Sequence, residues 1–474
     1  MMRFPCRHRH AKVKHHGAAL MIMIVILVMG IVAALIGALS LSTLQSARQG
    51  KTSAALAQAK EALIGYAVTY GDNYSGQVHG YLPCPDTSGS SEGSAAPPCG
   101  TTNQNAIGKL PWKVLGLPPL RDGDGECLWY AVSGTYKNNP KTGLMNWDTN
   151  GLLQAYASDG TLITPTDNKA VAIIIAPGAA QSGQNRSGTT APVCGGNYTA
   201  ANYLENNVTL SINNADVATG KFVQGVSGSS VNDQFIFITR EDIWNAAQKR
   251  TDFQNTLKLL TQRVAECIAN FGKHNNDLAN KSLPWPAWVS FATTNSDYAD
   301  NLNYNDKFGM YAGRVPYKVN TSSLTTGNSI STPYYLLQDD APAGSANCPS
   351  GWATIYPWWD NWKDHLYYAI GKKFEPASTS TGSCGGGTCL TINGAGNYAA
   401  VVILAGKKLS GQTRANKSLA ADYLEGLNNV NFVATPVVAP IATGAENYQT
   451  GPVSSTFNDI LYCIKEDLTV IPCP

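Results

Sequence analysis

An uncharged apolar run near the start of the chain is the clearest pattern in the sequence. Residues 18–39 carry no charge and are rich in Ile, Val, Leu, Met and Ala, and the next charged side chain is Arg48. A run of this length spans a bilayer as a helix, and it exceeds the apolar core of most cleaved secretory signals. We therefore predict a transmembrane helix over residues 18–46.

Helical spacing of apolar residues continues beyond that run and returns in the middle of the chain. Leu56, Leu63 and Ala67 keep the helical period, so the first helix is expected to extend out of the membrane. A second helix is predicted over 253–271, with one apolar face and with charges that disfavour burial in lipid. We expect this second helix to pack on a sheet of its own.

Short segments of the first half of the chain recur in the second half in the same order. The buried-strand pattern VAIIIA at 171–176 is matched by AVVILA at 400–405. The other matched pairs are 56–58 with 260–262, 82–85 with 283–286, 128–132 with 366–370, 182–186 with 410–414, 203–205 with 423–425, 232–233 with 458–459, and 241–242 with 466–467. Eight ordered matches predict an internal duplication.

These patterns together predict an α+β protein. The expected modules are 47–248 and 249–474, each a helix followed by an antiparallel sheet with long loops. Their central strands should be the continuously apolar segments, buried on both faces.

Charge is concentrated at the N-terminus. Residues 1–17 hold five Lys or Arg and no acid, and the remainder has 29 basic against 32 acidic residues. Positive residues before an apolar helix predict a cytoplasmic leader at 1–17, with the bulk of the chain beyond the membrane. Nothing outside the leader indicates nucleic-acid binding.

The eleven cysteines indicate whether the protein resides in an oxidising or a reducing compartment. Cys6 lies in the leader, and the other ten lie beyond residue 80 in a chain rich in Gly, Ser, Thr and Asn. An even set of this kind predicts disulfides in an oxidising compartment, the alternative being free buried thiols. The candidate pairs are Cys384 with Cys389, Cys84 with Cys99, and Cys463 with Cys473.

The short basic N-terminal stretch ends in His15-His16-Gly17, and the apolar run begins at the next residue, Ala18. This junction resembles the prepilin (class III) signal of type IV pilins and type II secretion pseudopilins. The resemblance implies that prepilin peptidase cleaves after Gly17 and methylates Ala18. It also implies a bacterial inner-membrane protein with its bulk in the periplasm, which then joins an extracytoplasmic filament with other pilins or pseudopilins.

Two further features refine this resemblance. The segments 59–66 (AKEALIGY) and 82–87 (LPCPDT) resemble pilin-like proteins of proteobacteria. The fifth mature position, usually Glu in such pilins, is Ile22 here, as in certain minor pilins and tip pseudopilins that lack this Glu. The departure favours a tip or low-copy role over the filament shaft.

Few residues suggest chemistry. Beyond the leader the histidines are His79, His274 and His365, far apart in sequence, and no nucleophile or zinc motif is present, so we expect no catalytic residues. Asp122 and Asp124 lie in a Gly-flanked acidic stretch that is a candidate Ca²⁺ site, the alternative being an ordinary turn. No other cofactor is indicated.

Aromatic residues gather at Trp358, Trp359 and Trp362. They are candidates for a ligand-stacking surface, the alternative being buried packing, which is the commoner role of Trp. The expected function is therefore a non-enzymatic minor pilin or pseudopilin. A pilus-mounted adhesin or ligand-binding module is the alternative, and a signal-anchored envelope enzyme is a weaker one.

Overall fold

A computed structural model describes most of the chain: residues 16–88, 91–141, 143–226, 230–274, 282–289, 304, 306–319, 334–337, 348–376, 384–385, 387–414, 417–432 and 442–474. The helices are α1 (His16–Asn73), α2 (Arg240–Gln248), α3 (Thr251–His274), α4 (Trp352–Trp362) and α5 (Leu427–Val430). Helices and sheets are both substantial, which confirms the α+β class.

The first half is built on a four-stranded antiparallel sheet in the order β1-β2-β4-β8. Its strands are β1 (Ala106–Lys109), β2 (Trp129–Val132), β4 (Ala170–Ala176) and β8 (Gln234–Thr239). Every residue of β4 is buried, as its unbroken apolar sequence predicts. Two small sheets flank it, made of β3 (Gln154–Tyr156) with β7 (Lys221–Val223), and β5 (Asn206–Asn207) with β6 (Ile212–Asn213).

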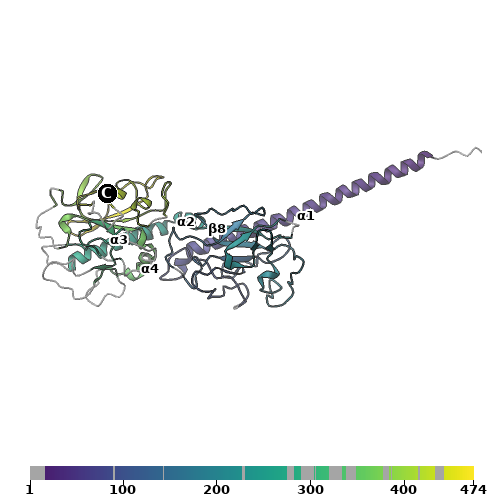
Figure 1. Ribbon diagram of the computed structural model, residues 1–474, viewed down its shortest axis with the longest axis horizontal. Coiled ribbons are helices and arrows are strands. Elements are labelled where there is room, and N and C mark those ends of the chain that lie inside the picture. Colours follow the sequence, from purple (N-terminus) through teal and green to yellow (C-terminus); the bar gives the residue numbers. More distant parts are fainter. Residues whose placement is uncertain are drawn as a thin grey trace, which may run out of the picture.

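Helix α1 has two parts with different surroundings. Its C-terminal part packs on β4 and β8 and buries Ala59, Leu63 and Ala67 completely. Its N-terminal part projects from the folded body (Figure 1). Among the described side chains of that part, Met23, Leu27 and Met29 are 74%, 63% and 62% exposed.

Among the helices that the structure describes, none combines the length and the apolar character that a membrane span requires. Most side chains of the predicted span, 18–46, lie outside the described residues.

The second half carries a larger sheet. Its main path is β15-β13-β14-β12-β9, and β16 pairs with β14 and with β17. The bounds are β9 (Ala312–Arg314), β12 (Leu366–Ile370), β13 (Leu390–Ile392), β14 (Ala395–Leu404), β15 (Asn447–Tyr448), β16 (Ile460–Lys465) and β17 (Val470–Pro472). A separate pair joins β10 (Lys318–Val319) to β11 (Tyr334–Tyr335).

The centre of this second sheet follows the arrangement of the first. The path β9-β12-β14-β16 is antiparallel throughout, as is β1-β2-β4-β8. Helix α3 packs on β14, β16 and β17, so the second predicted helix does cover a sheet of its own half. Its residues Phe253, Leu260 and Val264 are fully buried.

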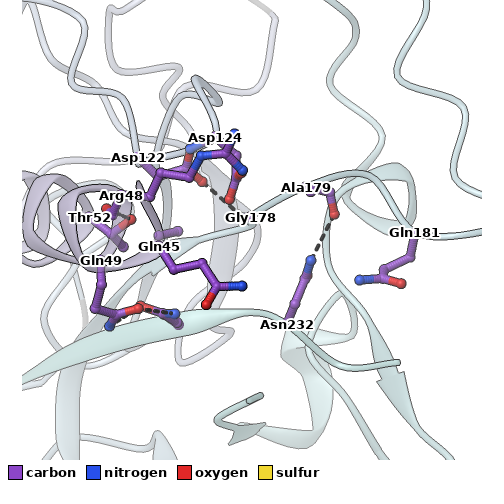
Figure 2. A pocket seen from close by; sticks show the side chains of 12 residues that line it. Gln45, Arg48, Gln49, Thr52, Asp122, Asp124, Gly178, Ala179, Gln181 and Asn232 are labelled. Atoms are coloured by element: carbon purple, nitrogen blue, oxygen red, sulfur yellow. Dashed lines mark hydrogen bonds and ion pairs between the residues drawn. The ribbon is translucent and has the colours of Figure 1, made fainter. Parts of the chain in front are cut away.

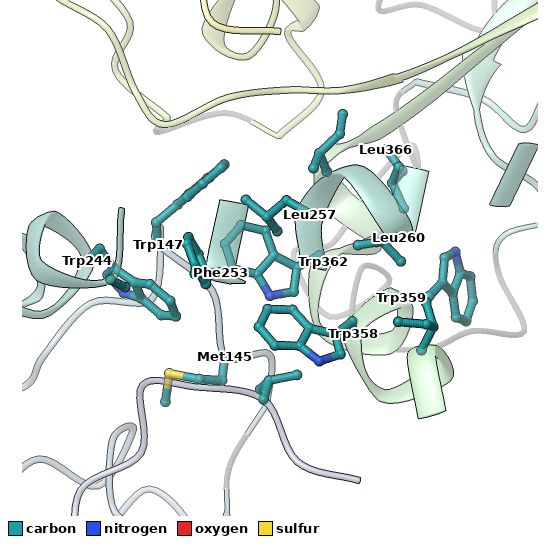
Figure 3. Close-up of a cluster of buried hydrophobic side chains, with 14 of the residues drawn as sticks. Met145, Trp147, Trp244, Phe253, Leu257, Leu260, Trp358, Trp359, Trp362 and Leu366 are labelled. Carbon is teal, nitrogen blue, oxygen red and sulfur yellow. The ribbon is translucent and has the colours of Figure 1, made fainter. Parts of the chain in front are cut away.

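The two halves meet in a shared aromatic core. Met145, Trp147 and Trp244 of the first half belong to the same buried cluster as Phe253 and Trp362. Figure 3 shows these side chains close together, with Trp244 on α2, Phe253 on α3 and Trp362 on α4. Trp362 packs edge-on against Trp147, with ring centroids 4.4 Å apart. The halves are therefore not separated by a solvated linker.

Candidate functional site

The predicted processing residues lie at the very start of the described chain. Gly17 and Ala18 belong to the first turn of α1. The leader through residue 15, including Cys6, lies outside the described residues, and so does the side chain of Ile22.

The cysteines of the described residues form five close pairs. Three are the pairs expected from the sequence, Cys84–Cys99, Cys384–Cys389 and Cys463–Cys473. The other two, Cys127–Cys194 and Cys267–Cys348, join residues 67 and 81 positions apart, and sequence proximity could not have found them. The pairs are compatible with disulfide cross-links in an oxidising compartment.

The acidic stretch at 121–126 forms a loop against α1. Both oxygens of the buried Asp122 carboxylate accept backbone N–H groups, Oδ1 from Asp124 and Glu126 and Oδ2 from Gly178, each at 2.9 Å. Burial raises the pKa of Asp122, and these hydrogen bonds oppose the rise. Asp124 forms an ion pair with Arg48 at 3.3 Å.

This loop and α1 border a small polar pocket of about 210 Å³ (Figure 2). Gly123 donates to Thr52 Oγ1 at 2.9 Å, and a side chain at Gly123 would meet the Arg48 carbonyl oxygen at 2.3 Å, so the loop requires glycine there. The described residues contain no group of three or more His, Cys, Asp or Glu arranged to hold a metal ion. In this structure the loop docks α1, and Ca²⁺ binding at Asp122 and Asp124 stays a prediction.

A buried carboxyl network organises the first half beside this pocket. Glu205 Oε2 accepts the backbone N–H groups of Asn232 and Asp233, both at 3.0 Å. Asp233 Oδ2 accepts from the Glu205 backbone at 2.9 Å and from Asn214 Nδ2 at 2.8 Å. Gln184 donates to Glu205 at 2.8 Å. Burial, followed by the neighbouring Glu205 charge, raises the pKa of Asp233 well above its usual value.

The second half contains a corresponding network, in which Gln412, Glu425 and Asp459 occupy matched positions and Asn428 takes the part of Asn214. Glu425 Oε2 accepts from the Asn458 backbone at 3.1 Å. Asp459 Oδ2 accepts from the Glu425 backbone at 3.2 Å and from Asn428 Nδ2 at 2.9 Å. Gln412 donates to Glu425 at 2.8 Å. Burial and then the Glu425 charge raise the pKa of Asp459 well above its usual value.

An arginine connects each network to the loop after the central strand. Arg186 donates to the Gly178 carbonyl, and Arg414 donates to the Gly406 carbonyl, both at 2.7 Å. The matched segments 182–186 and 410–414 contain these Gln and Arg residues. The sequence did not show that each Gln donates to a buried Glu, or that each Arg donates to the loop after the central strand. The networks hold strand and loop together and expose no reactive group.

A charged cluster crosses the junction between the halves. His365 is fully buried, and its Nε2 and Nδ1 lie 2.9 Å from Asp148 and from Asp364. Burial opposes its protonation, but Asp364 and Asp148 outweigh this effect and raise the pKa of His365. Lys417 pairs with Asp364 at 2.8 Å, and Arg414 approaches Asp148 at 3.6 Å. Because both ring nitrogens face carboxylates inside the protein, the cluster is suited to joining the halves.

The prediction that Trp358, Trp359 and Trp362 form a ligand-stacking surface is wrong, because all three side chains are buried. Trp358 is 7% exposed, and Trp359 and Trp362 are 0% exposed, because α4 turns them into the core (Figure 3). They therefore offer no open face on which a ligand could stack.

Comparison of the chain with protein-family models, with characterised proteins and with solved structures gives no match. A functional assignment therefore depends on the residues and geometry of this chain alone.

Proposed function

We propose that this protein is a minor pilin or pseudopilin, a non-enzymatic subunit of a type IV pilus or type II secretion-like filament. Residues 18–46 would anchor it in the inner membrane before assembly, and prepilin peptidase would release the leader after Gly17. The observation that carries the proposal is the helix α1, which is continuous over 58 residues and projects from the body.

The projecting part of α1 needs a partner. Its described apolar side chains, among them Met23, Leu27 and Met29, are mostly exposed. Apolar surface of this extent is unfavourable in water and marks a surface that lipid or other protein covers. A membrane would cover it before assembly, and neighbouring helices would cover it in a filament core.

The same helix is firmly joined to the folded body at its other end. Lys60 donates to the Phe237 carbonyl of β8 at 3.1 Å and pairs with Asp242 of α2 at 3.3 Å. Such an arrangement suits a stalk that carries a folded body. The absence of Glu at position 22 favours a tip position, since the subunit could not neutralise a neighbour above it.

We also propose that the two halves, 47–248 and 249–474, are copies of one module. The support is the matched sheet order together with the matched networks around Asp233 and Asp459. Buried polar networks depend on several partners at once, so the same arrangement is improbable at unrelated positions.

Processing tests the proposal directly. Gly17→Val should block cleavage, because the prepilin resemblance demands glycine before the scissile bond. Gly50→Val is the matched control, since Gly50 lies in the same helix and a side chain there meets nothing within 4 Å. An immunoblot of membranes should show shortened wild type and Gly50→Val chains and a full-length Gly17→Val chain.

Mass spectrometry of the mature N-terminus completes this test. A methylated Ala18 is the expected result. A mature terminus upstream of Gly17, or a Gly17→Val chain cleaved as well as wild type, would contradict the proposal.

A further inference from the structure

A second and larger cavity lies where the two halves meet. Its volume is about 670 Å³, within the usual range of ligand-binding clefts. Its walls come from the end of α2, the first two turns of α3, the loop 406–409 and the segment 453–460. The labelled side chains Trp147, Phe253 and Leu257 in Figure 3 form part of this wall.

The charge of this cavity has one sign. Four lysines line it, and no carboxylate is among the described lining residues: Lys249, Lys258, Lys407 and Lys408. Lys407 donates to Asn245, and Lys408 pairs at 3.5 Å with the exposed Asp167. Lys249 and Lys258 are exposed, and within the described structure their ammonium groups have no hydrogen-bond or ion-pair partner. Both are therefore available to an anionic ligand.

Two residues of the cavity wall have buried polar atoms without partners in the part of the chain that the structure describes. Trp147 is 4% exposed, and its indole Nε1 has no hydrogen-bond acceptor among the described residues. Asn458 Nδ2 donates to the Lys407 carbonyl at 2.7 Å, whereas its buried Oδ1 lacks a donor in the same described set. A buried polar atom without a partner is costly, but these two atoms are closed to water-sized groups, and the matched Asn232 Oδ1 of the first half also lacks a donor among the described residues, so the case for a ligand rests on the lysines and the aliphatic wall.

Apolar side chains supply the remaining wall. Val453 is 76% exposed, and Leu409 and Ile460 are partly exposed beside it. The aromatic rings of the wall are inaccessible to a ligand by comparison, because Phe253 is 0% exposed and Trp147 is 4% exposed. An open aliphatic surface suits an apolar side chain, whereas a sugar ring prefers an accessible aromatic face.

The pocket beside α1 provides an internal comparison. Its residues Gly178, Ala179 and Asn232 match Gly406, Lys407 and Asn458 of the second cavity. The pocket beside α1 contains one base, Arg48, and two acids, Asp122 and Asp124. The four lysines are therefore a property of the second site and not of the shared fold.

We propose that the cavity between the halves binds an acidic peptide segment of a partner protein. Side-chain carboxylates would pair with Lys249 and Lys258, and an aliphatic residue would lie against Val453. This inference goes beyond the proposed filament role and does not require it.

Binding is tested with the full-length protein in detergent and a fluorescent peptide of alternating Glu and Leu. Its matched control replaces each Glu by Gln. The Glu peptide should bind more tightly, and binding should weaken as salt is raised, because screening reduces charge pairing. The double variant Lys249→Gln, Lys258→Gln should lose about tenfold in affinity.

Two further variants separate the site from general charge and from folding. Lys221→Gln with Lys465→Gln removes the same charge from exposed positions outside the cavity and should leave binding unchanged. Val453→Glu adds a carboxylate at an exposed position, so it should abolish binding without affecting the fold.

Three outcomes would overturn the proposal. These are equal affinity for the Glu and Gln peptides, equal losses in the two lysine double variants, and binding of a sulfated oligosaccharide in place of the peptide. A failure here would leave the cleavage of Gly17 untouched, so the two proposals are tested separately.

Discussion

The two halves share their buried polar framework and differ in what surrounds it. Glu205 with Asp233 and Glu425 with Asp459 make corresponding hydrogen bonds at the same place relative to a central strand. The adjoining pocket faces α1 in the first half, whereas in the second it faces the first half itself. A buried network needs every partner in place, but the surface beside it can change charge freely.

The cross-links do not follow this shared framework. Cys84 of the first half corresponds to Trp285 of the second in the matched 82–85 and 283–286 segments. In the second sheet Cys463 of β16 lies opposite Val401 of β14. In the first sheet the corresponding residue of β8, opposite Ile173 of β4, is Phe237. The five cysteine pairs therefore fit each half separately, and the polar network is the stronger support for the proposed common module.

The largest expected effect is a loss of stability in one half of the protein when its own core is disrupted. Leu260 of α3 is 0% exposed, and its counterpart Leu56 of α1 is 6% exposed. Leu260→Asp loses buried apolar area and buries a charge, which should cost more than about 4 kcal/mol. In limited proteolysis, residues 249–474 should become sensitive while 47–248 stay protected, and Leu56→Asp should give the reverse.

Two results would break this comparison. Equal resistance of both halves in Leu260→Asp would contradict the packing of α3 on its own sheet. Loss of both halves together in either variant would show that the shared aromatic core makes them one folding unit.

The sequence predicted the fold best where a local pattern carried the information. The apolar segment 171–176 and residues 400–404 of the matched segment 400–405 are buried in central strands, and the apolar face of 253–271 covers the second sheet. The junction could not be predicted in this way. Asp148 and His365 lie 217 positions apart, and neither belongs to a periodic pattern.

The candidate sites show the same division between local and long-range information. Cys384–Cys389 was foreseeable from spacing, whereas Cys267–Cys348 depends on how α3 approaches a distant segment. The cluster Trp358, Trp359 and Trp362 was visible as composition, but only its placement in α4 decided that it is core. The lysine cavity joins segments from both halves, so no single stretch indicated it.

The next largest effect concerns the junction. His365→Gln should cost about 2–3 kcal/mol near pH 6, because it removes the cation that Asp148 and Asp364 share and leaves them only Arg414 and Lys417. The folded-state pKa of His365 is raised, so its stabilisation is complete below the unfolded pKa of about 6.5. This stabilisation is lost as pH rises through the folded pKa.

The contribution of the carboxylates of this cluster to stability depends on pH in the opposite direction. The pKa values of Asp148 and Asp364 are lowered, because His365 and the cations Arg414 and Lys417 outweigh burial. Their stabilisation is present above about pH 3.9 and is lost as pH falls through the folded values. Thermal unfolding should therefore show wild type and His365→Gln converging at alkaline pH. A difference that is constant between pH 6 and pH 10 would contradict a charged His365.

The smallest effect tests the shared framework most closely. Asp233 and Asp459 each have one buried oxygen, Oδ1, without a partner among the described residues, and each has a strongly raised pKa. A carboxyl group whose pKa is raised by folding binds its proton more tightly in the folded state, so it lowers stability as pH rises above about 3.9. Asn keeps the acceptor that Oδ2 provides and carries no charge.

Asp233→Asn and Asp459→Asn should therefore each raise the free energy of unfolding by about 1 kcal/mol at pH 7, with little change at pH 4. Chemical denaturation at both pH values measures the effect. Because Oδ2 of Asp233 and Oδ2 of Asp459 each accept from a Glu backbone N–H and from an Asn side chain, the two gains should agree in sign and in their dependence on pH. Stabilisation in one half with destabilisation in the other would show that the matched geometry hides different electrostatics, and it would remove the strongest support for a common module.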